Sequence, residues 1–316
     1  MIDLLFITDN FSLLEYNLDA TCLMMVTAQE MNYNVYSCLP EDLFIQDNEV
    51  YMKVQRTHLF YSSTDIIIKS NWYKKDKVVI KVSKEFNAII VRKDPPFNIE
   101  YYYLTQILMF AEQRGANVHN NSYSLRNYNE KLSILNFPEF IVPSIVSKNK
   151  EALIGFLEQH DECIIKPLNL MGGKGILRVS LSDLNFLSIL DIVTDSYTQV
   201  VMLQKFIPEV DFGDKRIIII DGEVINICLH RFPKLSYTNK KKSIFIEEYV
   251  TEITPNNMLI SRKVATWLKD NQISFAGIDI IGEYLTEINI TSPAGLKKIN
   301  DLMQFNIAKI FYSKIL

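Results

Sequence analysis

The sequence predicts an α/β protein built from more than one subdomain. Its 316 residues, of which 48% are hydrophobic, are enough for more than one core. In the first third of the chain, apolar runs of strand length alternate with segments of helical periodicity, which is typical of a parallel sheet covered by helices. Further on, the pair Asp221-Gly222 between two apolar runs is the strongest hairpin signal in the chain. Antiparallel pairing is therefore expected in the later part.

Residues 1–120 are expected to form an N-terminal α/β subdomain of Rossmann-like type. IDLLFITD predicts a buried strand that ends at Asp9, CLMMVTAQEMNY a helix, and NVYSCLP a second strand. FNAIIVRKDPPF predicts a strand that breaks at two prolines, and EYYYLTQILMFAEQRGANVHN predicts a helix followed by a short strand. The order of strand, helix and strand repeats, so a parallel sheet is expected here.

The rest of the chain is expected to form a central subdomain over 121–200 and a C-terminal subdomain over 201–316. In the central part we expect a helix in SLRNYNEKLSILNF, a helix in KNKEALIGFLEQHD, and strands in ECIIKPL and ILRVS around the glycine turn MGGKG. The C-terminal part predicts a strand in TQVVMLQKFIP, hairpins in DKRIIIIDGEVINICLHRF and DIIGEYLTEINITSP, and helices in PNNMLISRKVATWLKDNQ and GLKKINDLMQFNIAKIFYSKIL.

The amino-acid composition of the chain limits the partners, location and metal sites that are expected. With 33 basic and 37 acidic residues, the net charge of −4 does not favour nucleic acid or an anionic membrane surface. No apolar run is long enough to span a bilayer. The four cysteines form no CxxC pair and no signal peptide precedes the first strand, so a reduced, cytoplasmic protein is expected. The four histidines are isolated, which does not favour a histidine-rich metal site.

Three oxygen-bearing side chains lie on the hairpin DIIGEYLTEINITSP. Glu287 and Asn289 are two residues apart and point to the same face of their strand, and Asp279 on the preceding strand can face them. Two carboxylates and an amide oxygen suit Mg²⁺, which is commonly held by a few protein oxygens together with phosphates and water. An exposed polar face on an edge hairpin explains the same residues equally well when the motif is taken alone.

Lys166 and the glycines that follow it predict a phosphate site. A lysine at the end of an apolar strand is costly unless its ammonium meets an anion. Gly172, Gly173 and Gly175 let the backbone bend closely and direct N–H groups at an oxyanion. The loop has no GxxxxGK[ST] motif, and the alternative is a plain hairpin with a glycine turn. Lys131 lies in a predicted helix, where most lysines are solvated.

Two arginines stand near the ends of adjacent predicted strands. Arg216 follows Asp214 in GDKRIIII, and Arg231 lies in CLHRFP. Together they can hold carboxylates or a phosphoryl group bidentately, whereas the alternative is a set of surface ion pairs of little energetic value. The strand that runs into the kink at Pro208 offers free backbone groups, which are able to contact an adenine edge.

The motifs RKDPPF, SLRNYNEKL, IIKPLNLMGGKGILRV, GDKRIIIIDGE and GIDIIGEYLTEINITSP occur in the order and spacing of bacterial glutathione synthetase. The chain resembles that family, which belongs to the ATP-grasp carboxylate–amine ligases, over nearly its whole length. The resemblance implies an ATP-grasp fold whose two later subdomains grip ATP. It also implies that a substrate carboxylate takes the γ-phosphoryl group of MgATP, and that an amine then attacks the acyl phosphate to give an amide.

The resemblance also assigns roles to single residues, with ATP and Mg²⁺ (or Mn²⁺) as cofactors. It implies metal ligands at Asp279, Glu287 and Asn289, and an arginine near the transferring phosphoryl group at Arg216, with Arg231 on the substrate side. The implied nucleotide contacts are Lys131, Lys166, Met171, Gly172, Gly173, Gln204, Lys205, Phe206, Ile207 and Asp214. Peptide contacts are implied at Arg92, Asp94 and the Ser292-Pro293 turn.

One interval departs from the family pattern. After Arg231 the family has a glycine-rich, mobile lid with a further arginine and asparagine, but this chain reads RFPKLSYTNKKKSIFIEEYV, without glycine. Asn239 and Lys241 stand where the arginine and asparagine are expected, and SIFIEEYV looks more like a strand than a lid. The tri-lysine can supply point charges over a bound anion.

Three functions are consistent with these observations. The first is glutathione synthesis from γ-glutamylcysteine and glycine, and the second is a related ligase for another amino acid or peptide. The third is a nucleotide-binding protein without turnover, which the complete set of ATP and metal positions does not favour. All three imply small-molecule partners, and a homo-oligomer is consistent with the apolar helix in YYYLTQILMF.

Overall fold

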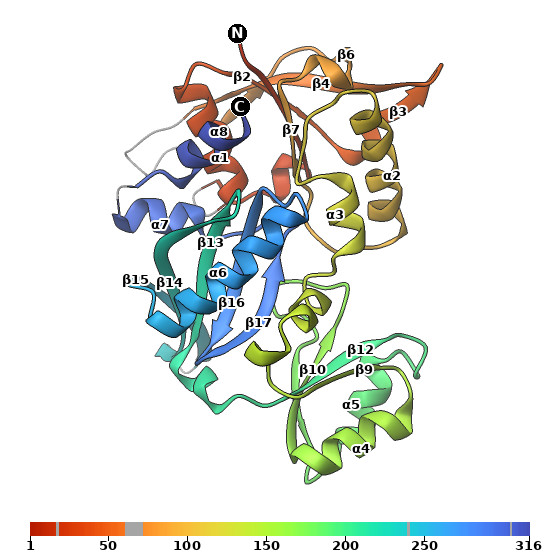
Figure 1. The fold of residues 1–316 in the computed structure, drawn as a ribbon, viewed down its shortest axis with the longest axis vertical. Helices are drawn as coiled ribbons and strands as arrows, with labels where there is room; N and C mark the ends of the chain where they lie inside the picture. The colour runs from red at the N-terminus through yellow and green to blue at the C-terminus, as the bar shows by residue number, and fades with distance from the viewer. Residues whose placement is uncertain (17–18, 61–71, 239–240, 304) are drawn as a thin grey trace.

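The computed structural model describes residues 1–16, 19–60, 72–238, 241–303 and 305–316, and within them the strands form three β-sheets. The sheets follow one another along the chain: strands β1–β8, then β9–β12, then β13–β17. Figure 1 shows the second sheet at the opposite end of the molecule from the first, with the third between them. The subdomain boundaries near residues 120 and 200 stay a prediction.

The first sheet is parallel at its centre and antiparallel at one side. Its strand order is β3-β4-β2-β1-β7-β8, with β5 and β6 also paired to β4. The parallel strands are β1 (Asp3–Thr8), β2 (Asn34–Cys38), β7 (Ala88–Arg92) and β8 (Val118–His119). The antiparallel strands, which the sequence patterns did not predict, are β3 (Leu43–Gln46), β4 (Glu49–Leu59), β5 (Tyr73–Lys75) and β6 (Val79–Val82).

Helices cover both faces of this first sheet. Side chains alternate along β1, so Leu4 and Phe6 join the core with α1 (Ala20–Glu30), while Leu5 and Ile7 join the core with α2 (Ile99–Gln113). A strand that is buried on both faces reads as a continuous apolar run, which is why DLLFIT predicted it well.

The second sheet is a small antiparallel sheet with one apolar face. Its order is β11-β10-β12-β9, formed by β9 (Ser144–Ser147), β10 (Glu162–Pro167), β11 (Leu177–Ser180) and β12 (Val201–Lys205). Cys163, Ile165 and Leu203 pack with α4 (Lys150–His160) and α5 (Phe186–Val193) on one face. The intervening residues, which include Lys166 and Gln204, therefore point to the other face.

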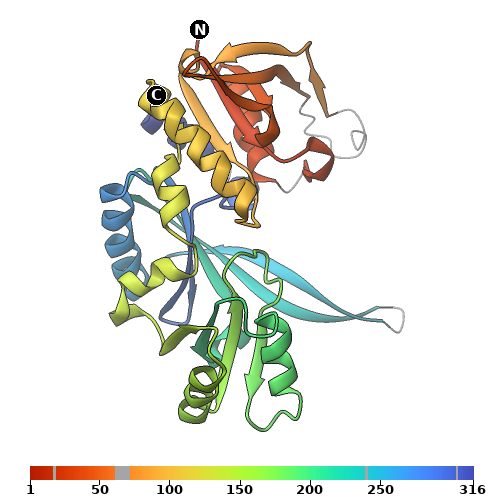
Figure 2. The same ribbon diagram turned by 90° about the vertical axis from the view of Figure 1, so that its right-hand side faces the viewer.

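The third sheet carries a long two-stranded ribbon. Its order is β15-β14-β13-β16-β17, formed by β13 (Asp214–Ile220), β14 (Glu223–Thr238), β15 (Lys241–Thr251), β16 (Phe275–Ile281) and β17 (Tyr284–Asn289), with α6 (Pro255–Asp270) packed on one face. β14 and β15 pair from Cys228–Thr251 to Thr238–Lys241, and Figure 2 shows this ribbon projecting from the body. The prediction of a strand in SIFIEEYV is confirmed, and Asn239 lies outside the described residues.

Two helix predictions were wrong in extent. α3 (Ser122–Asn127) ends before Lys131, which instead precedes a 3₁₀ turn over Leu132–Asn136, because the Asn129 side chain accepts the N–H groups of Lys131 and Leu132 at 3.0 and 3.1 Å. The C-terminal helix is two helices, α7 (Leu296–Met303) and α8 (Ile307–Ile315). Asn306 begins the second of these by accepting the Ala308 N–H at 3.1 Å, which is typical of an N-cap.

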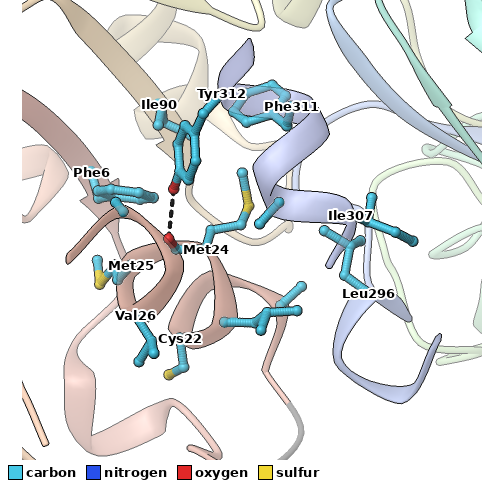
Figure 3. Packing of buried hydrophobic residues seen from close by; sticks show 14 of the residues in the cluster. Phe6, Cys22, Met24, Met25, Val26, Ile90, Leu296, Ile307, Phe311 and Tyr312 are labelled. Atoms are coloured by element: carbon cyan, nitrogen blue, oxygen red, sulfur yellow. Dashed lines mark hydrogen bonds between the residues drawn. The ribbon is translucent and has the colours of Figure 1, made fainter. Parts of the chain in front are cut away.

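The two ends of the chain share one core. Phe311 and Tyr312 of α8 pack among residues of α1 and the first sheet, and the Tyr312 hydroxyl donates to the Met24 carbonyl at 2.6 Å (Figure 3). Leu296 of α7 belongs to the same cluster. The C-terminal helices therefore fix the third sheet to the N-terminal sheet, and the second sheet takes no part in this core.

Candidate active site

A cavity of about 520 Å³ lies between the second and third sheets. It collects nearly all of the residues to which the sequence assigned nucleotide, metal or phosphoryl contacts. Those that line it are Lys131, Lys166, Gly172, Gly173, Gln204, Lys205, Phe206, Ile207, Asp214, Arg216, Arg231, Asp279, Glu287 and Asn289. Met171 is outside this lining, and its carbonyl accepts the Lys174 N–H at 3.2 Å within the glycine loop.

The strand register of the third sheet places its charged residues side by side. Asp279 on β16 is directly opposite Arg216 on β13 and directly opposite Glu287 on β17. Asp214 is likewise opposite Arg231 on β14. Directly opposed residues point to the same face of a sheet, so these five side chains face the cavity together.

Asp279 is the centre of a buried ion-pair group. Its carboxylate accepts from Arg216 Nε at 2.5 Å and Nη2 at 2.8 Å, and Arg231 Nη2 lies 3.0 Å away. The side chains of Arg216 and Asp279 are 7% and 8% exposed. Burial opposes ionisation of Asp279, but the two guanidinium groups outweigh it and hold the pKa of this carboxyl well below its usual range. These contacts exclude both the exposed polar face and the surface ion pairs as explanations.

Gly277 makes room for the Arg216 side chain. A Cβ atom at position 277 would lie 2.9 Å from Arg216 Cδ, closer than packed atoms approach. A glycine at this point of β16 therefore lets the guanidinium lie across the strand toward Asp279.

Both predicted phosphate lysines line the cavity, Lys131 buried and Lys166 half-buried. Lys166 Nζ donates to Gln204 Oε1 at 2.5 Å, and burial lowers the pKa of this ammonium to about 8 despite the attraction of Glu287. Lys131 is only 3% exposed, donates to the Leu170 carbonyl at 2.6 Å, and lies 3.1 Å from Glu287 Oε1. Lys131 is therefore not an ordinary solvated lysine, and both ammonium groups are available to an anion in the cavity.

The glycine loop needs its glycines for conformational reasons. Gly172, Gly173 and Gly175 have φ angles of +62°, +73° and +72°, a region that residues with side chains rarely adopt. A Cβ atom at Gly175 would also lie 2.8 Å from Pro167 Cγ. The loop can therefore approach a ligand closely from the second sheet.

We expected free backbone groups along the strand before Pro208. This prediction was wrong for the N–H groups of Lys205 and Phe206. β12 lies between β10 and β9, so it is not an edge strand. The Lys205 N–H donates to the Pro143 carbonyl and the Phe206 N–H to the Glu162 carbonyl, both at 2.9 Å. Any contact of these two residues with an adenine would have to use their carbonyl groups or side chains.

Both charged and apolar side chains line the cavity. Five basic and three acidic side chains line it, an excess of two positive charges that suits a polyanion. The apolar wall includes residues that the sequence analysis did not single out: Ile164, Ile176, Val210, Ile246 and Ile281. Strand alternation from Lys166 could have found Ile164, but the others approach from loops and other strands and carry no local signal.

The predicted peptide-side residues lie together beside a turn that follows β17. Ser292 donates its hydroxyl to the Asp94 carboxylate, and Arg92 donates from Nη2 to the Pro293 carbonyl at 3.1 Å. Arg92 is 4% exposed and its Nη1 has no hydrogen-bond partner among the described residues. The structure thus joins the RKDPPF segment to the Ser292-Pro293 turn.

The residues assigned to the metal fit a magnesium ion in their chemistry. Asp279, Glu287 and Asn289 are neighbours across β16 and β17, and Asn289 Nδ2 lies 3.2 Å from Asp279 Oδ2. Within the described ranges, no group of three or more His, Cys, Asp or Glu side chains is placed to hold a metal. Two carboxylates and an amide oxygen match the few protein oxygens that Mg²⁺ takes when phosphate and water complete its shell.

Two models of a known protein family match this chain. A family model described as the prokaryotic glutathione synthetase ATP-grasp domain matches residues 130–304, and one for the N-terminal domain of the same enzymes matches residues 2–126. The chain belongs to the prokaryotic glutathione synthetase family. Glutathione synthetase from Neisseria meningitidis serogroup A is 36% identical over 97% of this chain and 96% of its own length. The enzyme from Wigglesworthia glossinidia brevipalpis is 34% identical over 100% and 98%.

Solved structures confirm the predicted ATP-grasp fold. The D-cycloserine synthetase DcsG aligns with a TM-score of 0.67 at 10% identity, covering 99% of this chain and all of that one. The D-alanine–D-alanine ligase from Bacillus anthracis gives 0.60 at 15% identity, covering 100% and 94%. At such identities the likeness concerns the fold alone. No helix in the described part of this family member is long and apolar enough to cross a membrane.

Proposed function

We propose that this protein is an ATP-dependent ligase that joins γ-glutamylcysteine to glycine and so makes glutathione, ADP and phosphate. An oxygen of the substrate carboxylate attacks the γ-phosphorus of ATP while the bond to ADP breaks, giving an acyl phosphate. The amine nitrogen then attacks the acyl carbon, loses a proton, and expels phosphate with the former carboxylate oxygen. The chain supplies no covalent nucleophile; it contributes positioning and charge neutralisation.

One observation carries the proposal. The chain is about a third identical to glutathione synthetases along nearly their entire length, and its predicted ATP and metal residues meet in one cavity with an excess of positive charge. This convergence supports turnover rather than nucleotide binding alone, because nearly all of the residues predicted for nucleotide, metal and phosphoryl contacts are present in the same cavity.

The residues divide the work according to their positions. Lys131 and Lys166 neutralise phosphate oxygens in the cavity, which the Gly172-Gly173 loop also lines. Arg216 and Arg231 stand beside Asp279, where they stabilise charge on the transferring phosphoryl group. Asp279, Glu287 and Asn289 would hold Mg²⁺, which would neutralise phosphate charge when bound; Mn²⁺ is a predicted substitute.

The peptide substrate is assigned to the neighbouring turn. Arg92, Asp94 and Ser292 offer a buried guanidinium, a carboxylate and a hydroxyl, which suit the carboxylate and ammonium of a γ-glutamyl group.

The four cysteines are unpaired and buried, which supports a cytoplasmic location. A homo-oligomer stays a prediction.

A second candidate is a ligase of the same descent with another acceptor amine. The observation that favours it is the paired ribbon of β14 and β15, which replaces the glycine-rich lid that the family resemblance implies. Ladder pairing up to Lys241 leaves less freedom to open and close than a glycine loop has. Ile246 on this ribbon is among the residues that line the nucleotide cavity.

Phosphate release from MgATP by the purified protein tests the proposal. We expect release that requires both γ-glutamylcysteine and glycine, with glutathione appearing in equal amount. Release with γ-glutamylcysteine and an amine other than glycine would favour the second candidate. Binding of MgATP without turnover in a screen of amino acids and dipeptides would contradict both.

A further inference from the structure

The backbone that follows β17 is held by side chains rather than by a neighbouring strand. β17 ends at Asn289, a proposed metal ligand, and Ser292 of the peptide-side turn comes three residues later. Between them, one carboxylate oxygen, Glu130 Oε1, accepts the Ile290 N–H at 2.8 Å, the Thr291 N–H at 3.0 Å and the Thr291 hydroxyl at 2.8 Å. A single atom thus fixes the only two residues that separate the two functional positions.

A second side chain holds the same segment from the other direction. Asn120 donates from Nδ2 to the Ile290 carbonyl and to the Phe275 carbonyl, both at 2.7 Å. It also accepts the Phe275 N–H at 2.9 Å through Oδ1. Asn120 therefore links Ile290 to β16. Glu130 links Ile290 and Thr291 to the part of the chain that lies beside the active-site cavity.

Glu130 belongs to a tripeptide that bridges the two sheets of the cavity. Its carbonyl accepts the Ile288 N–H on β17 at 2.9 Å. On one side of it, Asn129 donates to the Leu168 carbonyl at 2.8 Å; on the other, Lys131 donates to the Leu170 carbonyl at 2.6 Å. Leu168 and Leu170 lead directly into the glycine loop, so residues 129–131 set the distance between that loop and β17.

We propose that Glu130 is a positioning residue that places Asn289 for the metal and Ser292 for the peptide at the same time. The inference rests on the proposed function, since it assumes that these two residues contact magnesium and peptide. Groups that orient metal ligands through hydrogen bonds commonly change metal affinity or activity by about 10- to 100-fold when removed. One carboxylate oxygen of Glu130 accepts three of the hydrogen bonds that hold the segment between β17 and the Ser292 turn.

The chemistry of this link predicts which substitution is tolerated. All three donors converge on Oε1, so an amide oxygen at the same place can accept them. Glu130→Gln should therefore retain the arrangement, whereas Glu130→Ala leaves two backbone N–H groups without their partner. Rescue by glutamine and not by alanine distinguishes hydrogen-bond positioning from a need for the charge.

Glu112 offers a matched control. It is another part-buried glutamate that accepts a backbone N–H and a hydroxyl, both from Ser122, and it lies at the end of α2 away from the cavity. Glu112→Ala should lower the free energy of unfolding to a similar degree as Glu130→Ala. It should leave the dependence on magnesium and peptide unchanged, because its hydrogen-bond partner, Ser122, is not one of the residues assigned to the metal or the peptide.

The experiment compares the parent protein, Glu130→Ala, Glu130→Gln and Glu112→Ala in steady-state kinetics. For Glu130→Ala we expect the Mg²⁺ concentration at half-maximal rate and the KM for γ-glutamylcysteine each to rise about tenfold or more. For Glu130→Gln we expect both within about threefold of the parent. Values for Glu130→Ala within twofold of the parent, or equal changes in Glu112→Ala, would overturn the proposal.

A second readout does not need turnover. Hydrogen exchange of the backbone amides of residues 288–292, and the Mg²⁺ dependence of ADP binding, report the arrangement of this segment directly. Faster exchange and weaker Mg²⁺ dependence in Glu130→Ala support the role of Glu130 even if the parent does not make glutathione. Unchanged exchange and metal dependence would overturn it whatever the substrate proves to be.

Discussion

The half-buried Lys166 ammonium should make nucleotide binding depend on pH. The side chain is at the end of β10, contacts Gln204, and has its pKa lowered to about 8 by burial. An ammonium attracts a phosphate oxygen by charge, and a neutral amine does not. The affinity for ADP in the absence of metal should therefore fall as the pH rises through 8.

The size of the effect follows from the pKa. About nine-tenths of the Lys166 side chains carry the proton at pH 7 and about one-tenth at pH 9, so the apparent Kd for ADP should rise about tenfold between these pH values. The unfolded chain, with its lysine at 10.5, binds the proton more tightly between pH 8 and 10.5. The contribution of this group to the free energy of unfolding therefore increases as pH rises across that window, by about 3 kcal/mol in full.

Calorimetric titration with ADP between pH 6.5 and 9.5 measures this dependence. Lys166→Met should bind more weakly at pH 7 and lose the slope between pH 7 and 9. Lys84→Met, which removes an exposed lysine paired with Glu49 far from the cavity, should keep the slope of the parent. A parent protein with constant affinity over this range, or a slope that survives in Lys166→Met, would refute the reasoning.

Three further predictions concern the metal group, the buried ion pair and the ribbon. Glu287→Ala should abolish Mg²⁺-dependent turnover with an unchanged circular dichroism spectrum, and retained activity would remove this residue from the metal site. Asp279→Ala should lower the free energy of unfolding in urea by about 3–5 kcal/mol, since two guanidinium groups lose their buried partner; a loss below about 1 kcal/mol would contradict the burial argument. A glycine-rich segment grafted over 233–246 should raise glycine-dependent turnover if the ribbon limits closure, and no gain would indicate that the ribbon serves another acceptor.

The sequence predicted those features that depend on local periodicity. Alternation along a strand put Glu287 and Asn289 on one face, and the apolar run before Arg92 predicted a buried strand ending at the RKDPPF segment. The resemblance to a known family then predicted that motifs far apart in the sequence form one site. The cavity brings those residues together, and the roles that the resemblance implies for them are predictions.

Long-range features escaped the sequence for physical reasons. The row from Arg216 through Asp279 to Glu287 depends on β16 lying between β13 and β17, and no local pattern encodes strand order. Lys131 was assigned to a helix because its neighbours have helical spacing, yet Asn129 ends that pattern with side-chain hydrogen bonds. The short strands β3 and β6 are largely exposed, so their composition gave a weak signal.

Transfer of an oxygen label tests the central claim most directly. γ-Glutamylcysteine with ¹⁸O in both oxygens of its reacting carboxylate is incubated with MgATP, glycine and the protein, and the phosphate is examined by mass spectrometry. Formation of an acyl phosphate predicts one ¹⁸O atom in each phosphate released, with one glutathione made for each. Phosphate without label, or label transfer without any glutathione, would contradict the assignment of this chain as a glutathione-forming ligase.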